Sequence, residues 1–215
     1  MNDVSHRALP PRHKHTALHL RAGALVALLW PALAGAQNTF HWTTNYYAVT
    51  GATLVEIRQS INQSRPWKGR LEMDGLTEWS IHWRFQVEPS ANGCRCRSFT
   101  TQVAITNTLP RWRPPATVAA TIKKSWEGYI VPLGQHETGH AQIALAAAAE
   151  VRKRVGELGE EPDCDGLKKK INDLAHRIVE NYRQRDRDYD ERTNHGANQG
   201  AALPDRVRGG VNPKP

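Results

Sequence analysis

Between residues 40 and 112 the chain alternates apolar and polar positions as β-strands do. Segment 77–87 carries an aromatic or aliphatic side chain at every second position, so one face is expected to be buried and the other solvated. Segments 40–47 and 99–105 are also rich in aromatic and β-branched residues. Residues 52–63 instead have apolar side chains at helical spacing. The first half therefore predicts an antiparallel sheet with one helix.

After residue 115 the composition shifts toward Ala, Glu, Lys and Arg, and apolar residues recur every three or four positions. This spacing is typical of helices that bury one face. Three helical stretches are predicted, at residues 116–129, 133–158 and 166–192. Pro132 is expected in the first turn of the second stretch, where a missing N–H costs least.

From Gly196 onward the chain is dominated by Gly, Pro, Asn and Arg without periodicity, which predicts a disordered tail at residues 197–215. The expected fold class is α+β, with a β-rich part at residues 37–112 and a helical part at 115–195. Together these form one domain, residues 37–196.

The first 36 residues have the order of a secretory signal peptide. A basic stretch ends at Arg21, an apolar run covers residues 22–33, and the small residues Ala34-Gly35-Ala36 follow. The run is too short for a helix that needs about 20 residues to cross a bilayer. Cleavage after Ala36 is therefore expected, with an uncleaved anchor as the alternative. The mature protein should be periplasmic or secreted, and no later segment predicts a membrane span.

The formal net charge of +8 and the pI of about 9.7 raise the question of a nucleic-acid partner. Four basic residues and one acidic residue lie in the predicted signal peptide, which leaves about +5 for the mature chain. The Trp and Tyr residues are scattered and form no nucleic-acid-binding signature. We therefore expect no nucleic acid as partner.

Three cysteines occur in the chain: Cys94, Cys96 and Cys164. In an exported protein they are candidates for a disulfide bond. Cys94 and Cys96 are too close in sequence to pair easily in a strand or turn, so one of them is expected to pair with Cys164. The alternative, a Cys-x-Cys metal site, lacks a second close pair.

The candidate catalytic and metal-binding residues lie in one motif, His136-Glu137-Thr138-Gly139-His140, within a predicted helix. Residues four apart lie on one helix face, so His136 and His140 can present two imidazole nitrogens to one ion. In this motif the Glu after the first His acts as general base toward a zinc-activated water. The motif therefore predicts a Zn²⁺ cofactor and hydrolysis of amide bonds, with Glu137 as the catalytic residue.

A catalytic zinc usually has three protein ligands. The extended motif with a third His six residues after His140 is absent, because position 146 is alanine. If the last two helices form a hairpin that turns near Glu161, the residues opposite the motif fall around 182–188. The candidates are Glu180, Asp186, Asp190 and His195; His195 is preferred and Asp190 is second.

Several motifs together resemble a family of exported bacterial proteins, the domain-of-unknown-function 922 family, which is predicted to contain zinc-dependent proteases. They are Trp126 with His136-Glu137-x-x-His140, Tyr189-Asp190-x-x-Thr193-x-His195-Gly196, Cys94-x-Cys96, Leu109-Pro110 and Tyr46-Tyr47-x-Val49-x-Gly51. The resemblance extends from about Thr39 to Gly196. It implies a zincin-like α+β domain and metal binding at His136 and His140, and it adds weight to Asp190 and His195.

The leading expectation is thus an exported zinc metallopeptidase that acts on a peptide, a protein or peptidoglycan-like amides. A non-catalytic module that binds zinc or a protein on the same scaffold is the alternative. A third possibility is an envelope protein whose basic surface holds an anionic polymer and whose histidines bind no metal. The substrate and the oligomeric state are not encoded in any motif.

Overall fold

The computed structural model describes residues 38–67 and 73–203, and the predicted signal peptide lies outside them. Three strands form one sheet in the order β1-β3-β2. β1 pairs with β3 in parallel, and β2 pairs with β3 antiparallel. The elements are β1 (Thr39–Val49), α1 (Leu54–Ser64), β2 (Leu76–Ser90), β3 (Gly93–Trp112), α2 (Ala120–Gly156), α3 (Cys164–Thr193) and the short 3-10 helix η1 (Ala197–Gln199). The predicted α+β fold class is confirmed, but the sheet is mixed and not antiparallel throughout as predicted, because β1 runs parallel to β3.

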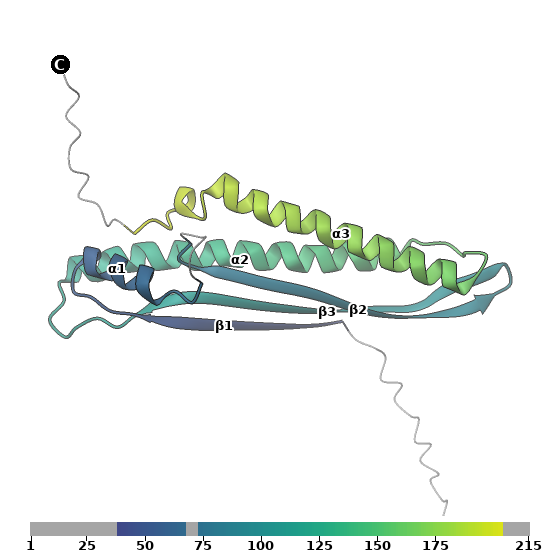
Figure 1. Ribbon diagram of the computed structural model, residues 1–215, viewed down its shortest axis with the longest axis horizontal. Coiled ribbons are helices and arrows are strands. Elements are labelled where there is room, and N and C mark those ends of the chain that lie inside the picture. Colours follow the sequence, from purple (N-terminus) through teal and green to yellow (C-terminus); the bar gives the residue numbers. More distant parts are fainter. Residues whose placement is uncertain (1–37, 68–72, 204–215) are drawn as a thin grey trace, which may run out of the picture. The chain divides into compact units, whose positions relative to one another are not determined.

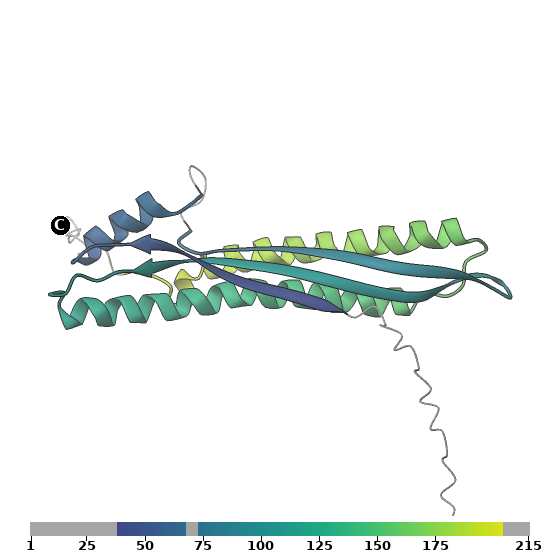
Figure 2. The same ribbon diagram turned by 90° about the horizontal axis from the view of Figure 1, so that it is seen from below.

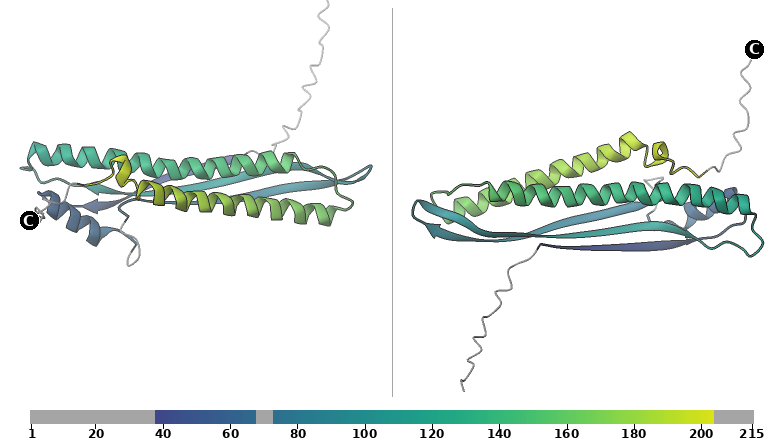
Figure 3. Two further views of the ribbon diagram at one scale, coloured as in Figure 1. Left: turned by 90° about the horizontal axis from the view of Figure 1, so that it is seen from above. Right: turned by 180° about the vertical axis from the view of Figure 1, so that it is seen from behind.

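The alternating segment at residues 77–87 is part of β2, an antiparallel strand as predicted. Its apolar side chains, from Trp79 to Val87, pack on the helices, whereas Glu78, His82 and Arg84 are exposed. Both long helices lie side by side over this face of the sheet (Figures 1 and 3), and the view from below shows the opposite face (Figure 2). The alternation therefore orients the strand toward the helices.

α2 is one continuous helix, whereas two stretches separated before Pro132 were predicted. A proline inside a helix removes a backbone hydrogen bond and costs about 3 kcal/mol. Here Tyr129 and Leu133 on either side of Pro132 are both buried in one apolar cluster. Packing on both sides of the proline keeps the helix continuous.

α1 forms where helical spacing predicted it. Thr53 and Glu56 make a reciprocal capping box at its start, which satisfies two backbone N–H groups. Ile57 and Ile61 are fully buried one turn apart. They anchor α1 near the first turns of α2 (Figure 1).

The buried side chains form two apolar clusters along α2. One joins β2 and β3 to four alanines and two valines of α2 and to α3. The other joins β1 and α1 to the start of α2, and it ends on α2 at Leu133. The first cluster begins on α2 at Ala141. The motif His136–His140 therefore occupies the polar gap between two hydrophobic cores.

Cys94 on β3 and Cys164 at the first position of α3 form a disulfide bond. This confirms the pairing of one Cys-x-Cys cysteine with Cys164, and Cys96 has a free thiol. Around the bond, Cys94 and Glu161 exchange two backbone hydrogen bonds. Asp163 then caps α3 by accepting from the backbone N–H of Gly166. The start of α3 is thus fixed to the sheet.

The chain after α3 corrects the prediction of a disordered tail from residue 197. Asn194, His195 and Gly196 all adopt left-handed backbone angles, which reverse the chain after the helix. η1 follows, and Leu203 is buried against the cluster of α1 and α2. Apolar periodicity was a poor guide here because one leucine and a tight turn are enough to dock this segment. Residues 204–215 lie outside the described part.

Within the described ranges, no helix is both long and apolar enough to span a membrane. The disulfide is compatible with an exported protein.

Replacing both Cys94 and Cys164 with serine should lower the free energy of unfolding by about 2–5 kcal/mol, because the bond closes a long loop. Denaturant unfolding of the full chain measures this. Cys96→Ser is the matched control and should change stability by less than about 1 kcal/mol. Equal losses in the control and the double variant would contradict the assigned pairing.

Candidate metal centre

His136 and His140 lie one turn apart on α2 and are almost completely buried, at 2% and 5% exposure. Their rings are 4.8 Å apart and nearly perpendicular. The two Nε2 atoms are only 3.2 Å from one another. The helix thus delivers the converging pair of nitrogens that the motif predicted.

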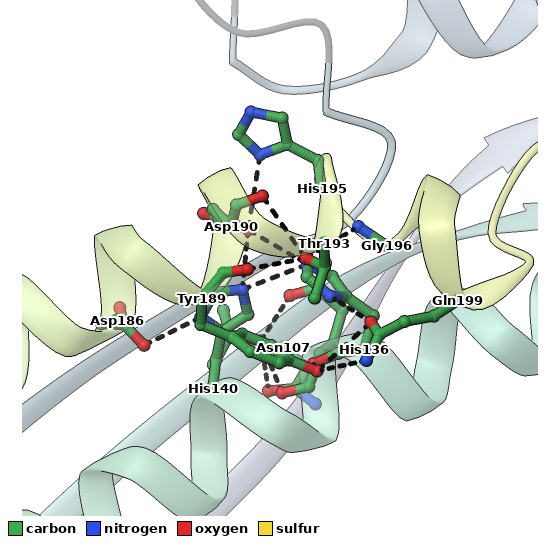
Figure 4. A network of polar contacts seen from close by, with 12 residues as sticks. Asn107, His136, His140, Asp186, Tyr189, Asp190, Thr193, His195, Gly196 and Gln199 are labelled. Atoms are coloured by element: carbon green, nitrogen blue, oxygen red, sulfur yellow. Dashed lines mark hydrogen bonds and ion pairs between the residues drawn. The ribbon is translucent and has the colours of Figure 1, made fainter.

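α3 brings two carboxylates against these histidines (Figure 4). Asp190 Oδ1 lies 3.1 Å from His136 Nε2 and 3.0 Å from His140 Nε2. Asp186, one turn earlier, has its Oδ1 2.8 Å from His140 Nδ1. The other oxygen of Asp186 accepts a hydrogen bond from the Trp79 indole of β2. Two i, i+4 pairs on antiparallel helices therefore meet face to face.

The outer nitrogen of each imidazole faces an oxygen acceptor. Gln199 Oε1 lies 2.9 Å from His136 Nδ1, and Asp186 Oδ1 lies against His140 Nδ1. An acceptor at Nδ1 favours the tautomer with its proton there, which leaves the lone pair on Nε2. Both lone pairs then point at the position that Asp190 also faces. This is the arrangement of metal-ligating histidines with supporting acceptors.

Among the described residues, His136, His140 and Asp190 are the group whose ligand atoms lie close enough together to hold a metal ion. Asp190 takes the third position in this group, for which His195 was the preferred candidate. His195 Nδ1 lies 3.3 Å from Asp190 Oδ1, and nearly half of the His195 side chain is exposed. In Figure 4 Asp190 stands between His195 and the two other histidines. The reason is that Asp190 is still on the helical face toward α2, whereas His195 follows the left-handed turn.

Glu137 is also buried, at 3% exposure, but it faces β2. The Thr77 hydroxyl donates to its Oε2 over 2.6 Å and lies 3.1 Å from Asn107 Oδ1. Gly75 lies so close to Glu137 that a β-carbon there would collide with the carboxylate. Burial raises the pKa of Glu137, although the hydrogen bond from Thr77 acts in the opposite direction.

Tyr189 covers the histidines from the side of α3. Its ring stacks on His136 with centroids 4.9 Å apart and contacts the edge of His140. This approach requires Gly139, because a β-carbon at that position would overlap the Tyr189 hydroxyl. Gly196 is required for a similar reason, since its backbone, at φ +82°, passes directly against the His136 side chain.

The two aspartates make the cluster attractive to positive charge. Burial lowers the pKa of His140, but the hydrogen bonds and charges of Asp186 and Asp190 outweigh burial and raise the pKa to about 10. For Asp190 burial raises the pKa, and hydrogen bonds from His136 and His140 bring it well below its usual value. The same carboxylate charges that favour a proton on His140 also favour a divalent cation, which competes with protons for such ligands.

A cavity of about 110 Å³ opens beside the cluster. His136, Glu137, His140, Asp190 and His195 all line it. All the side chains predicted to form the site therefore border one cavity, which is large enough for a metal ion and a few water molecules.

The sequence model of the family described as "Bacterial protein of unknown function (DUF922)" matches residues 44–196. The chain belongs to this family. The DUF922 region starts within β1 and ends at Gly196, so it contains both motif histidines and Asp190. No curated protein and no solved structure matches the chain.

Three supporting residues of this DUF922 protein were missed in the sequence. Gln199 lies in the segment predicted to be disordered, where no pattern marks it. Gly75 has no signal of its own. Thr77 could have been noticed, because it precedes Trp79 in the alternation and therefore shares the inward face of β2.

Gly139→Ala should destabilise the protein by about 1–3 kcal/mol, because the new methyl group displaces Tyr189 from His136. Gly134→Ala is the matched control on the same helix, where a β-carbon meets no atom within 4 Å. Alanine should stabilise that position by about 0.5–1 kcal/mol. Denaturant unfolding measures both, and equal effects would contradict the close packing at Gly139.

Asp190→Ala should remove stoichiometric binding of a divalent metal, whereas His195→Ala should keep about one ion per chain, as expected for three protein ligands. Elemental mass spectrometry after incubation with Zn²⁺ and dialysis measures this. Asp186→Ala and Gln199→Ala should weaken metal affinity by about 10–100-fold, because each removes an acceptor at Nδ1. The opposite result for Asp190 and His195 would assign the third ligand to His195.

Proposed function

We propose that this protein is an exported zinc-dependent hydrolase that cleaves amide bonds in peptides or peptidoglycan-like substrates. The observation that carries the proposal is the convergence of His136 Nε2, His140 Nε2 and Asp190 Oδ1, which lie 3.0–3.2 Å from one another. A buried glutamate next to this group completes the parts that such a reaction needs.

The donor set is compatible with zinc and disfavours calcium and magnesium. Two imidazoles and one carboxylate are typical of catalytic zinc sites, whereas calcium and magnesium prefer oxygen ligands throughout. A tetrahedral site with bonds of about 2.0–2.1 Å separates its ligand atoms by about 3.3 Å. The three observed separations are close to this value, so the side chains need only small shifts. Three protein ligands also leave a position for water or substrate.

When bound, zinc polarises a carbonyl group and makes a water molecule acidic near neutral pH. In the proposed reaction, Glu137 would accept the proton of that water, and its position next to His136 in the cavity wall supports this role. Its burial raises its pKa toward the range in which a carboxylate acts efficiently as a base. The Thr77 hydroxyl can donate to the carboxylate or accept from the acid, so it supports Glu137 in both states.

The half-exposed His195 borders the same cavity. A neutral imidazole can donate to the carbonyl oxygen of a bound amide, and a protonated one can stabilise negative charge that develops there. His195 could therefore stabilise the carbonyl oxygen of the substrate without being a metal ligand.

Glu137→Gln should retain the metal ion and lower kcat/KM by about 10²–10⁴-fold, because the amide cannot accept the proton. Zinc content and cleavage of casein and of a defined peptide mixture, followed by mass spectrometry, measure this on the full chain. Glu127→Gln, an exposed position on the same helix, is the control and should leave both unchanged.

Unchanged cleavage in Glu137→Gln would remove Glu137 from the reaction. Zinc binding without cleavage by the unmodified protein would support the alternative, a non-catalytic zinc-binding module.

A further inference from the structure

A second cavity, of about 460 Å³, adjoins the cavity at the metal cluster. The two share four lining residues: Met73, Asp74, Leu133 and His195. The size falls in the range of roughly 300–1,000 Å³ that is common for ligand sites. A substrate held at the metal cluster could therefore extend into the second cavity.

Arg65 brings to this cavity a positive charge that no carboxylate of the described residues pairs. The other charged side chains of its wall have partners: Arg58 contacts Asp74 at 2.6 Å, and His195 contacts Asp190. Within residues 38–67 and 73–203, Arg65 makes no ion pair, and its buried Nη1 has no hydrogen-bond acceptor. Asp74 also accepts a hydrogen bond of 2.8 Å from the Tyr129 hydroxyl.

A buried N–H of a charged group without an acceptor costs free energy, so an acceptor from a ligand would stabilise it. A guanidinium binds carboxylates and phosphates best, through paired hydrogen bonds. One uncompensated positive charge matches the single charge of a carboxylate better than the double charge of a phosphate. Asn62, which lines the same cavity, adds a neutral side chain that can donate to the second oxygen.

We propose that this cavity is a subsite that receives a substrate carboxylate and that Arg65 is the residue that selects it. The inference rests on the proposed amide hydrolysis at the adjoining cluster and names its substrate class. The carboxylate is either the C-terminal group of a peptide or the side chain of an acidic residue near the scissile bond.

Binding of small probes tests the subsite independently of turnover. Isothermal titration calorimetry on full-length Glu137→Gln, with and without zinc, would use three probes: acetyl-trialanine, its C-terminal amide, and an amidated peptide with a glutamate as its last residue. Either acetyl-trialanine or the glutamate peptide, whichever places its carboxylate at Arg65, should bind about tenfold tighter or more than the uncharged amide. The acid and the glutamate peptide distinguish the two sources of the carboxylate.

Adding Arg65→Met should abolish the preference for the charged probe, and adding Arg65→Lys should retain part of it. Arg154→Met, a half-exposed arginine of α2 that does not line this cavity, is the matched control and should keep the preference. If Arg65→Met fails to fold, Asn62→Asp at an exposed position places a repelling carboxylate in the same cavity. It should weaken the charged probe about tenfold relative to the amide.

Equal affinities for all three probes, or a preference that survives Arg65→Met, would overturn the subsite. Failure of the proposed hydrolysis gives a different result: Glu137→Gln would then leave cleavage unchanged, or no cleavage would occur, while the probes still discriminate. In that case the carboxylate subsite stands and belongs to a binding protein.

Discussion

The register of α3 against α2 is the constraint on which the site depends. His136 contacts Asp190, and His140 contacts Asp186. In each pair, the histidine precedes residue 163 by as many sequence positions as the aspartate follows it. That residue is the cap at which α3 begins. The Cys94–Cys164 bond and the backbone hydrogen bonds around Glu161 fix this end of α3 to the sheet. A slip by one residue would turn both carboxylates away from the histidines, since neighbouring positions on a helix face different directions.

Burial of so many polar groups is tolerated because their partners come from every surrounding element. β2 contributes Thr77 and Trp79, α3 contributes the aspartates, and the turn after α3 contributes Gln199. The apolar clusters on both sides hold these elements in place. Low polarity around the site strengthens each hydrogen bond and makes unpaired charge costly. The histidine–aspartate group therefore has the geometry and the partners to hold a cation.

Three polar groups of the site have different chemical roles in the proposed function. In the proposed function, the cluster facing α3 holds the metal ion, Glu137 facing β2 acts as the base, and Arg65 in the cavity beyond His195 binds an anionic group. Because the two cavities share walls, these parts lie along one continuous space. An amide hydrolase that recognises a substrate by its carboxylate requires these three functions in one connected site.

The sequence by itself determined the strand regions, the helix α1, the helical second half, the motif pair His136 and His140, and the choice of Cys164 as disulfide partner. These follow from local rules: strand and helix periodicity, i, i+4 geometry, and the strain of a close cysteine pair. A hairpin turn assumed near Glu161 placed the facing residues about one turn too early. Only the tertiary structure showed that the facing histidine–aspartate pairs are symmetric about residue 163, that α2 continues through Pro132, and that Asp190 rather than His195 faces the histidines. It also showed that Gln199 contacts His136, that Leu203 is buried, and that Arg65 lines the second cavity. Such contacts depend on how elements distant in sequence pack, and no periodicity within one element records that packing.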